Sequence, residues 1–213
     1  MSSRDDMLAA IRSNKPGLDR ALPEVPLFND DPRPPLLAMF RDNLQRMGGI
    51  FLDPVSGDDP LVSVREKLAA ANIVCSTVPE IAGNRDIAKV TRPQDLADVD
   101  VAIVRAAFAV AETGSVLLTD ADLYVNTVAY LAQHLIVLLD PAYIVVNLHS
   151  AYRRPEFRTR PYAAFHTGPS ATADIEGVLI HGAQGVRSLS VLPLGRGAIA
   201  ALSPDRQLTE HQV

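Results

Sequence analysis

The feature that most constrains the fold is the uninterrupted apolar run Leu135–Leu139. A strand with one solvated face alternates apolar and polar residues, whereas a strand covered on both faces has no need to. The run therefore indicates a central strand of a largely parallel sheet. It is interrupted by Asp140 and Pro141 and is too short to cross a bilayer as a helix.

Other segments combine β-branched or aromatic residues with nearby turn residues, which is typical of strands. Strands are expected at Ile50–Leu52, Ile73–Ser76, Val99–Arg105, Phe108–Ala111, Ser115–Thr119, His134–Leu139, Ala163–Thr167 and Leu189–Leu194. Helices are expected at Met7–Ser13, Leu36–Met47, Asp58 to about Ala71, and Ala171–Gly182. Helices that separate such strands predict an α/β fold with a largely parallel sheet.

The chain of 213 residues is long enough for one domain with its own core and two extensions. We place the domain at 36–197, an N-terminal extension at 1–35 and a polar tail at 198–213. The extension joins a short helix to an arm of six prolines, which exclude a helix. Such an arm is either a mobile tail of a monomer or a strap across a neighbour in a homo-oligomer, and both readings stay open.

Composition excludes several classes of function. Cys75 is the only cysteine, so this chain has no disulfide framework, no four-cysteine zinc site and no iron–sulfur cluster of its own. A net charge of −5 and a pI near 5.5 argue against a dedicated nucleic-acid binder. The first residues lack the apolar core of a signal peptide, so we expect a soluble cytoplasmic protein without a membrane partner.

The first segment suited to chemistry is Ala111–Ser115, between two predicted strands. Gly114 lets the backbone turn, and Thr113 and Ser115 add hydroxyl groups. Glu112 is an isolated carboxylate after apolar residues, so it is a candidate base, nucleophile or substrate clamp. The alternative is a hairpin turn whose glutamate caps nearby amides.

The second segment is 167–176, where a turn follows a predicted strand and a hydroxyl residue then caps the helix expected over 171–182. Free amides at a helix start bind anions, so a phosphate or carboxylate would rest there. Asp174 would orient a ligand hydroxyl. Plain helix capping is the alternative. The candidate ligand-binding residues of this segment are Gly168, Pro169, Ser170, Thr172 and Asp174.

Two further features of the sequence each allow two interpretations. The stretch Arg153–Arg160 holds four arginines in eight residues, which would either clamp an acidic substrate or partner or form a solvated loop. The histidines show no metal-binding spacing. His166 lies just before the second segment, so it would either reach a bound ligand or belong to the core.

Taken together, the two segments resemble the LUD-domain family, whose name comes from lactate utilisation, and most of all its lactate utilisation protein C (YkgG-like) type. The resemblance is carried, in this order, by Phe108–Val116, Gly168–Glu176 and Leu179–Leu194. The chain departs from the family pattern at Asp120–Asn126, where a Gly- or Asn-containing turn is usual. We therefore expect a different pocket wall on that side.

The resemblance implies an open sheet of the NagB/RpiA/CoA-transferase group, with helices on both faces. It also implies a role beside two iron–sulfur partner proteins that oxidise L-lactate to pyruvate. The leading hypothesis is an accessory component without a cluster, cofactor or metal, which binds a small carboxylate or docks the redox partners. In this hypothesis the Gly168–Thr172 amides receive the anion, and Glu112 and Thr113 approach from the neighbouring strand end.

Two other hypotheses remain. The first is a stand-alone enzyme of the same fold group, acting on a phosphosugar or a CoA thioester, in which Glu112 is the base or the acyl acceptor. CoA transferases usually need a larger, two-part domain than this chain provides. The second is a structural or regulatory module whose contact surface is the proline-rich arm.

Overall fold

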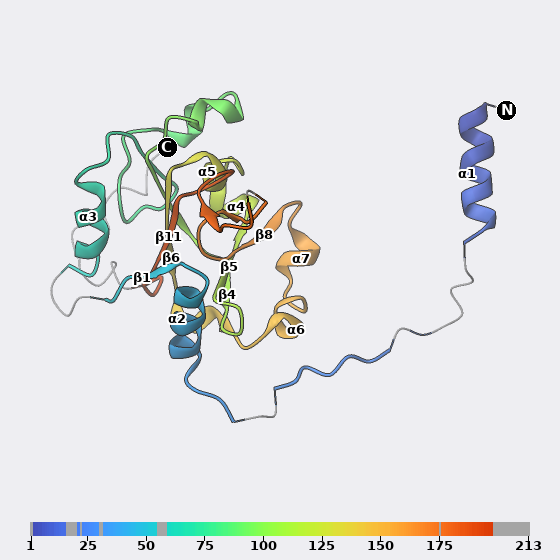
Figure 1. Ribbon diagram of the computed structural model, residues 1–213, viewed down its shortest axis with the longest axis horizontal. Helices are drawn as coiled ribbons and strands as arrows, with labels where there is room; N and C mark the ends of the chain where they lie inside the picture. The colour runs from blue at the N-terminus through green and yellow to red at the C-terminus, as the bar shows by residue number, and fades with distance from the viewer. Residues whose placement is uncertain are drawn as a thin grey trace, which may run out of the picture.

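The computed structural model describes residues 2–15, 21, 23–29, 32–54, 59–174 and 176–197 (Figure 1). The polar tail expected at 198–213 and Asp58, expected at the start of a helix, lie outside the described residues. Among the described residues, no helix has both the length and the apolar character needed to span a membrane.

The centre of the molecule is a five-stranded sheet in the order β1-β11-β6-β3-β2, with every neighbouring pair parallel. Residues 135–139 of the central strand are all buried, because layers pack on both faces of the sheet. The predicted open α/β fold with a largely parallel sheet is confirmed. The strands are β1 (Ile50–Phe51), β2 (Val74–Ser76), β3 (Val101–Arg105), β6 (His134–Leu139) and β11 (Ser188–Pro193).

A second sheet of four strands, in the order β7-β4-β5-β8, was not anticipated. The pairs β4–β5 and β5–β8 are antiparallel, and β4–β7 is parallel. Its small and β-branched side chains, such as Ala109 and Val116, share one apolar cluster with Val104 and Val137 of the central sheet. The strands are β4 (Phe108–Val110), β5 (Ser115–Thr119), β7 (Ile144–Val145) and β8 (Ala163–His166).

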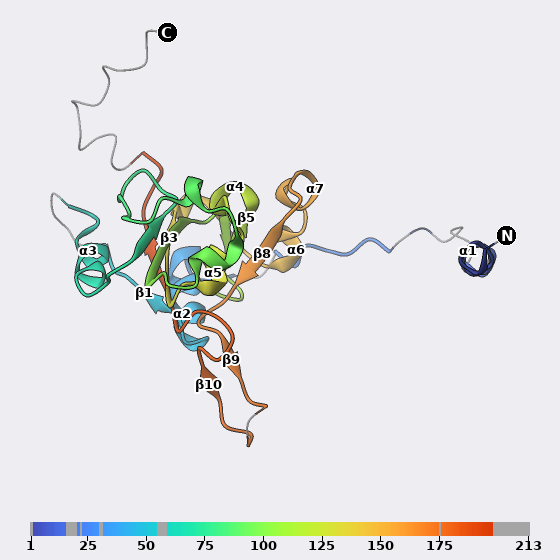
Figure 2. The same cartoon turned by 90° about the horizontal axis from the view of Figure 1, so that it is seen from above.

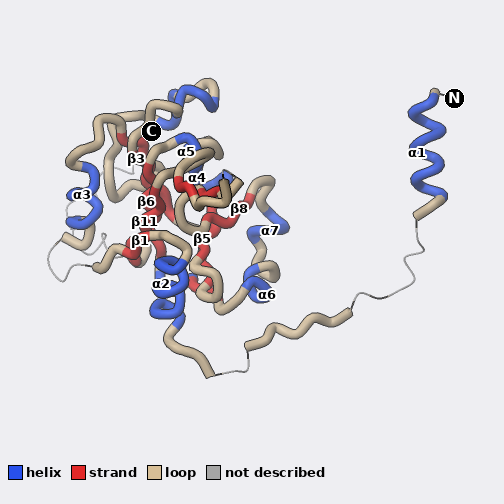
Figure 3. Tube along the Cα trace, viewed as in Figure 1, coloured by secondary structure: helices blue, strands red, loops and turns tan. Residues whose placement is uncertain are grey.

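Short helices surround the two sheets (Figure 3). Helix α2 packs Phe40 and Leu44 into the cluster between the sheets, whereas α3 and the residue before it cover the opposite face of the central sheet through Val64 and Leu61. Helix α1 buries no residue and lies away from the rest of the chain (Figure 1). The α-helices are α1 (Ser3–Ser13), α2 (Leu36–Arg46), α3 (Val62–Leu68), α4 (Asp120–Leu123), α5 (Val128–Leu131), α6 (Leu148–Ala151) and α7 (Glu156–Thr159).

The prediction of a helix at Ala171–Gly182 is wrong. The segment forms an antiparallel hairpin of β9 (Ala171–Thr172) and β10 (Ile180–His181), which projects from the body (Figure 2). Its base is closed by Ser170, which donates its amide to Val186 and accepts from the amide of Gly182. The helix signals were all local, and these pairings across the chain take the place of helical bonds.

The proline-rich arm lies across α6 of its own chain. The side-chain amide of Asn147 donates to the carbonyl oxygen of Leu27 at 2.6 Å, and the Arg153 guanidinium donates to that of Val25 at 2.9 Å. The Phe28 and His149 rings meet with centroids 4.9 Å apart. The described part of the arm is therefore a strap, held within one subunit.

Candidate functional site

The turn between β4 and β5 is held rigidly by its own backbone. The amides of Ala111 and Glu112 donate to the carbonyl oxygens of Val145 and Val146 at 2.8 and 3.0 Å. From α2, the side-chain amide of Asn43 donates to the carbonyl oxygen of Ala111 at 2.8 Å. These bonds attach the turn to β7 on one side and to α2 on the other, so the position of Glu112 is well defined.

Gly114 is required at this turn for two reasons. Its φ of +65° lies in the left-handed region, and a Cβ atom there would stand 2.2 Å from the backbone nitrogen of Leu44. Beside it, the hydroxyl groups of Thr113, Ser115 and Thr167 form a chain with oxygen distances of 2.7 and 2.5 Å. These hydroxyl bonds join the first segment to Thr167, the first residue of the second segment.

The carboxylate of Glu112 is exposed and lies beside the start of α6. Its Oε2 accepts a hydrogen bond from the amide of Leu148 at 3.1 Å. The capping alternative is therefore confirmed as a local contact of this side chain. A carboxylate bonded through one oxygen keeps acceptor capacity on the other, so the cap does not exclude a functional role.

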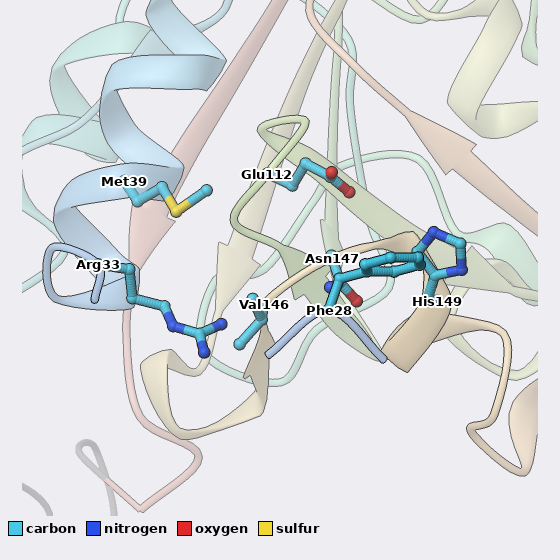
Figure 4. A pocket seen from close by; sticks show the side chains of 7 residues that line it. All are labelled: Phe28, Arg33, Met39, Glu112, Val146, Asn147 and His149. Atoms are coloured by element: carbon cyan, nitrogen blue, oxygen red, sulfur yellow. The ribbon is translucent and has the colours of Figure 1, made fainter. Parts of the chain in front are cut away.

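A cavity of about 230 Å³ opens beside Glu112 (Figure 4). It is bounded by the arm, the start of α2, the β4–β5 turn and the start of α6. A cavity of this size has room for several water molecules, and so for a small organic acid. The lining residues are Phe28, Arg33, Met39, Glu112, Val146, Asn147 and His149.

The polar groups around this cavity have complementary roles. Arg33 supplies a guanidinium, which pairs with carboxylates through two parallel N–H bonds. It is held in place by a further bond to the carbonyl oxygen of Asn29. Glu112 supplies an acceptor for a ligand hydroxyl, and the imidazole of His149 can donate or accept. The arrangement is suited to a small acid that bears a hydroxyl or keto group.

The second segment takes a different part in the structure. Gly168 has a φ of +64°, and a Cβ atom there would stand 2.2 Å from the carbonyl oxygen of Met47, just after α2. The amide of Ser170 is already bonded to Val186, at 2.9 Å. Thr172 accepts from the amide of Asp174 at 3.3 Å. The predicted helix N-terminus, on which the anion site depended, is absent from this hairpin.

The two segments thus meet, but the cavity beside Glu112, as the described residues define it, is not shared by both. Both pack against α2, Gly114 at Leu44 and Gly168 at Met47, and the bond between Ser115 and Thr167 links them. The cavity beside Glu112 has no lining residue from the second segment. Ligand binding by Thr113, Gly114, Ser115, Gly168, Pro169, Ser170, Thr172 and Asp174 stays a prediction.

The arginine-rich stretch is mostly attached to its own chain. Arg154 bonds to Glu156 at 2.8 Å and lies over the Phe108 ring, 4.6 Å from its centroid. Arg153 holds the arm, and Arg160 lies 3.8 Å from Asp120. These contacts favour a structural role over a clamp for an acidic ligand.

His166 lies at the end of β8, between the two segments. Burial lowers the pKa of its imidazole to about 4, and its Nε2 has no hydrogen-bond partner among the described residues. The ring lies against Tyr130, with centroids 5.1 Å apart. The hydroxyl of Tyr130 bonds to that of Tyr162 at 2.5 Å, and burial raises the pKa of Tyr162.

Sequence reasoning missed most of the residues that line the cavity. Arg33 belongs to an arm in which the prolines were the only sequence signal. Asn147 caps a helix of one turn, and His149 belongs to that helix. The signal that was available is the isolated carboxylate of Glu112. The partners that complete the cavity come from segments more than a hundred residues apart.

Comparisons with known proteins agree with this architecture. The LUD domain profile matches residues 64–192. A crystal structure of a DUF162 family protein from Deinococcus radiodurans shares the fold, with a TM-score of 0.58 and 20% identity over 75% of this chain and 96% of that chain. No curated protein matches this sequence. With a profile that spans more than half of its length, the chain belongs to the LUD domain family.

Proposed function

We propose that this protein is an accessory component of a lactate utilisation system, of the lactate utilisation protein C type, and that it binds a small 2-hydroxy or 2-oxo acid. The observation that carries the proposal is the cavity in which Arg33 and Glu112 are both lining residues. Arg33 pairs with the carboxylate of the acid, and Glu112 accepts a hydrogen bond from its hydroxyl. Family membership supports the choice of L-lactate and pyruvate as the acids.

In this proposal, electron transfer belongs to iron–sulfur partner proteins. Four thiolates normally hold a cluster, and this chain has one cysteine. The thiol of Cys75 is fully buried in β2, and burial raises its pKa, which disfavours the thiolate that would ligate a metal. The chain acts by holding the acid or by docking the partners, without a cluster of its own.

Calorimetric titration with L-lactate and with pyruvate tests the acid-binding role. We expect saturable binding, weakened at least about tenfold in Arg33→Met, because the carboxylate loses its bidentate partner. Arg158→Met is the matched control, since Arg158 is exposed on α7 and outside the cavity. This control removes the same charge and should change the affinity less than about twofold.

Glu112→Gln separates the two acids. It should weaken L-lactate more than pyruvate, because only lactate has a hydroxyl that donates to the carboxylate. If neither acid binds, the acid-binding role is contradicted and only the docking role remains. The docking role is tested by co-purification with the iron–sulfur partners before and after deletion of residues 1–35.

A stand-alone acyl-transfer enzyme is the second candidate, favoured by the exposed carboxylate of Glu112 at the cavity. In that reaction Glu112 would attack the thioester carbonyl, expel the CoA thiolate and form a mixed anhydride. Mass spectrometry after incubation with acetyl-CoA would show an acetyl adduct at Glu112. Its absence from folded protein would remove this candidate.

We also propose that the functional domain is wider than the matched segment and covers 36–197. Strand β1 pairs with β11 inside the central sheet, and α2 carries the buried Phe40 and Leu44. Both elements precede residue 64, where the profile match begins. Without β1 the central sheet would lose an edge strand. Without α2 the β4–β5 turn would lose the helix that it packs against.

A further inference from the structure

Two adjoining cavities lie near the amino-terminal ends of the central strands, away from the cavity beside Glu112. Their volumes are about 220 and 290 Å³. They share Lys67, Val101 and His134 as lining residues, so they form one continuous recess between the end of α3 and the sheet. We call this recess the α3 recess.

Sheet register places polar side chains side by side on the floor of the α3 recess. Val101, His134 and Ser188 are aligned neighbours on β3, β6 and β11. The Nδ1 atom of His134 lies 2.8 Å from the Oγ of Ser188, so the two form a hydrogen bond. Ser190 follows two residues later on the same face and also lines the recess, although apolar residues usually fill such a position.

The α3 recess has more positively than negatively charged side chains. Lys67 and Arg187 both line it, and neither forms an ion pair with any residue that the structure describes. Asp100 also lines it, but its Oδ2 already accepts hydrogen bonds from the amides of Asn72 and Ile73, at 2.8 and 2.9 Å. Two cationic groups therefore face one carboxylate that is already solvated by the backbone.

The α3 recess is separated from the Glu112 cavity by the central sheet. Val101 and Ile136 of the recess belong to the apolar cluster on the α3 side, whereas Ala109 and Ala111 beside Glu112 belong to the cluster on the opposite side. The two cavities share no lining residue. A ligand in one does not touch a ligand in the other.

We propose that the α3 recess binds a small phosphate-bearing metabolite. A phosphate group accepts hydrogen bonds in several directions, which fits the donors of Lys67 and Arg187 at the recess. The apolar walls, Val101 and Ile136 among them, accommodate the carbon skeleton. The site is independent of the acid-binding role proposed for the Glu112 cavity.

Inorganic phosphate is the probe for the first experiment, with acetate at the same ionic strength for comparison. Binding is followed by amide chemical shifts in NMR spectra of the whole chain. We expect saturable shifts at Ser188 and Ser190 with phosphate, and at least about tenfold weaker binding in Lys67→Met. Lys67 is exposed, so this variant should fold as the wild type does.

Two matched variants make the test specific. Lys89→Met removes the same charge from an exposed site outside the recess, and Arg33→Met alters only the other cavity. Both should bind phosphate within about twofold of the wild type. No saturable shift, equal binding of acetate, or an unchanged affinity in Lys67→Met would each overturn the proposal. A loss of phosphate binding in Arg33→Met would do the same, because it would place the anion in the Glu112 cavity.

Discussion

The β4–β5 turn and the β9–β10 hairpin contain similar residues, glycine with serine or threonine beside an acidic side chain, yet they have opposite surroundings. Gly114 and Gly177 have nearly the same φ, +65° and +70°, in the left-handed region. A Cβ atom at Gly114 would overlap the backbone of α2, whereas one at Gly177 would have no neighbour within 4 Å among the residues that the structure describes. The comparison shows that a local residue pattern determines the left-handed turn at the glycine. Packing against other elements decides whether that turn becomes part of the core.

The largest effect expected from this difference concerns the two glycines. Both substitutions to alanine place a side chain in the left-handed region, at a cost of about 1–2 kcal/mol. Gly114→Ala also creates an overlap with α2, so its free energy of unfolding should fall by about 3 kcal/mol or more. Gly177→Ala should cost about 1 kcal/mol. Urea denaturation of both variants measures the difference, and equal costs would contradict the account.

A smaller effect is expected in the pH dependence of the free energy of unfolding. Here His166 in β8 is compared with His181 in the hairpin. Burial lowers the pKa of His166 to about 4, so the folded state favours the neutral ring. Its contribution to stability is therefore present above the unfolded pKa of about 6.5 and is lost as the pH falls toward 4. Between pH 7 and pH 5 the wild type should lose about 2 kcal/mol more than His166→Gln.

His181→Gln is the control for this pH effect, because His181 is exposed in β10. Its loss of stability between pH 7 and pH 5 should match that of the wild type. Urea denaturation at both pH values checks this expectation. A His166→Gln variant with the full pH dependence of the wild type would show that another group is responsible.

The smallest effects concern single hydroxyl groups. Ser115→Ala removes the centre of the chain between Thr113 and Thr167, so it should cost about 1 kcal/mol. Thr172→Val removes one bond to the amide of Asp174 in the exposed hairpin and should cost less than about 0.5 kcal/mol. Thermal unfolding of the two variants checks the order. A larger loss in the hairpin variant would reverse the comparison.

The sequence was sufficient for the central sheet, because its signal is strong and local. The run Leu135–Leu139 predicted a strand buried on both faces, and β6 is that strand. The expected helix at Leu36–Met47 is α2, and a left-handed Gly48 follows its last residues. Patterns of this kind depend on burial along one element, so they can be read without knowledge of the partners.

The sequence was not sufficient for the second sheet, the hairpin or the cavity. Strand β7 has two residues, too few for a periodic pattern. The hairpin at 171–182 has helix-like capping residues, but β9 pairs with β10 instead, and Ser170 closes the base through bonds to Gly182 and Val186. The cavity joins Arg33 to Glu112 and His149, whose proximity depends on the path of the whole chain. Such sites follow from tertiary contacts, which no local pattern encodes.

A crystal structure of the protein with saturating pyruvate tests the central claim most directly. We predict that the acid lies in the cavity beside Glu112, with its carboxylate within about 3 Å of the Arg33 guanidinium. Pyruvate bound instead at Gly168–Thr172, or absent from the cavity at saturating concentration, would contradict the claim.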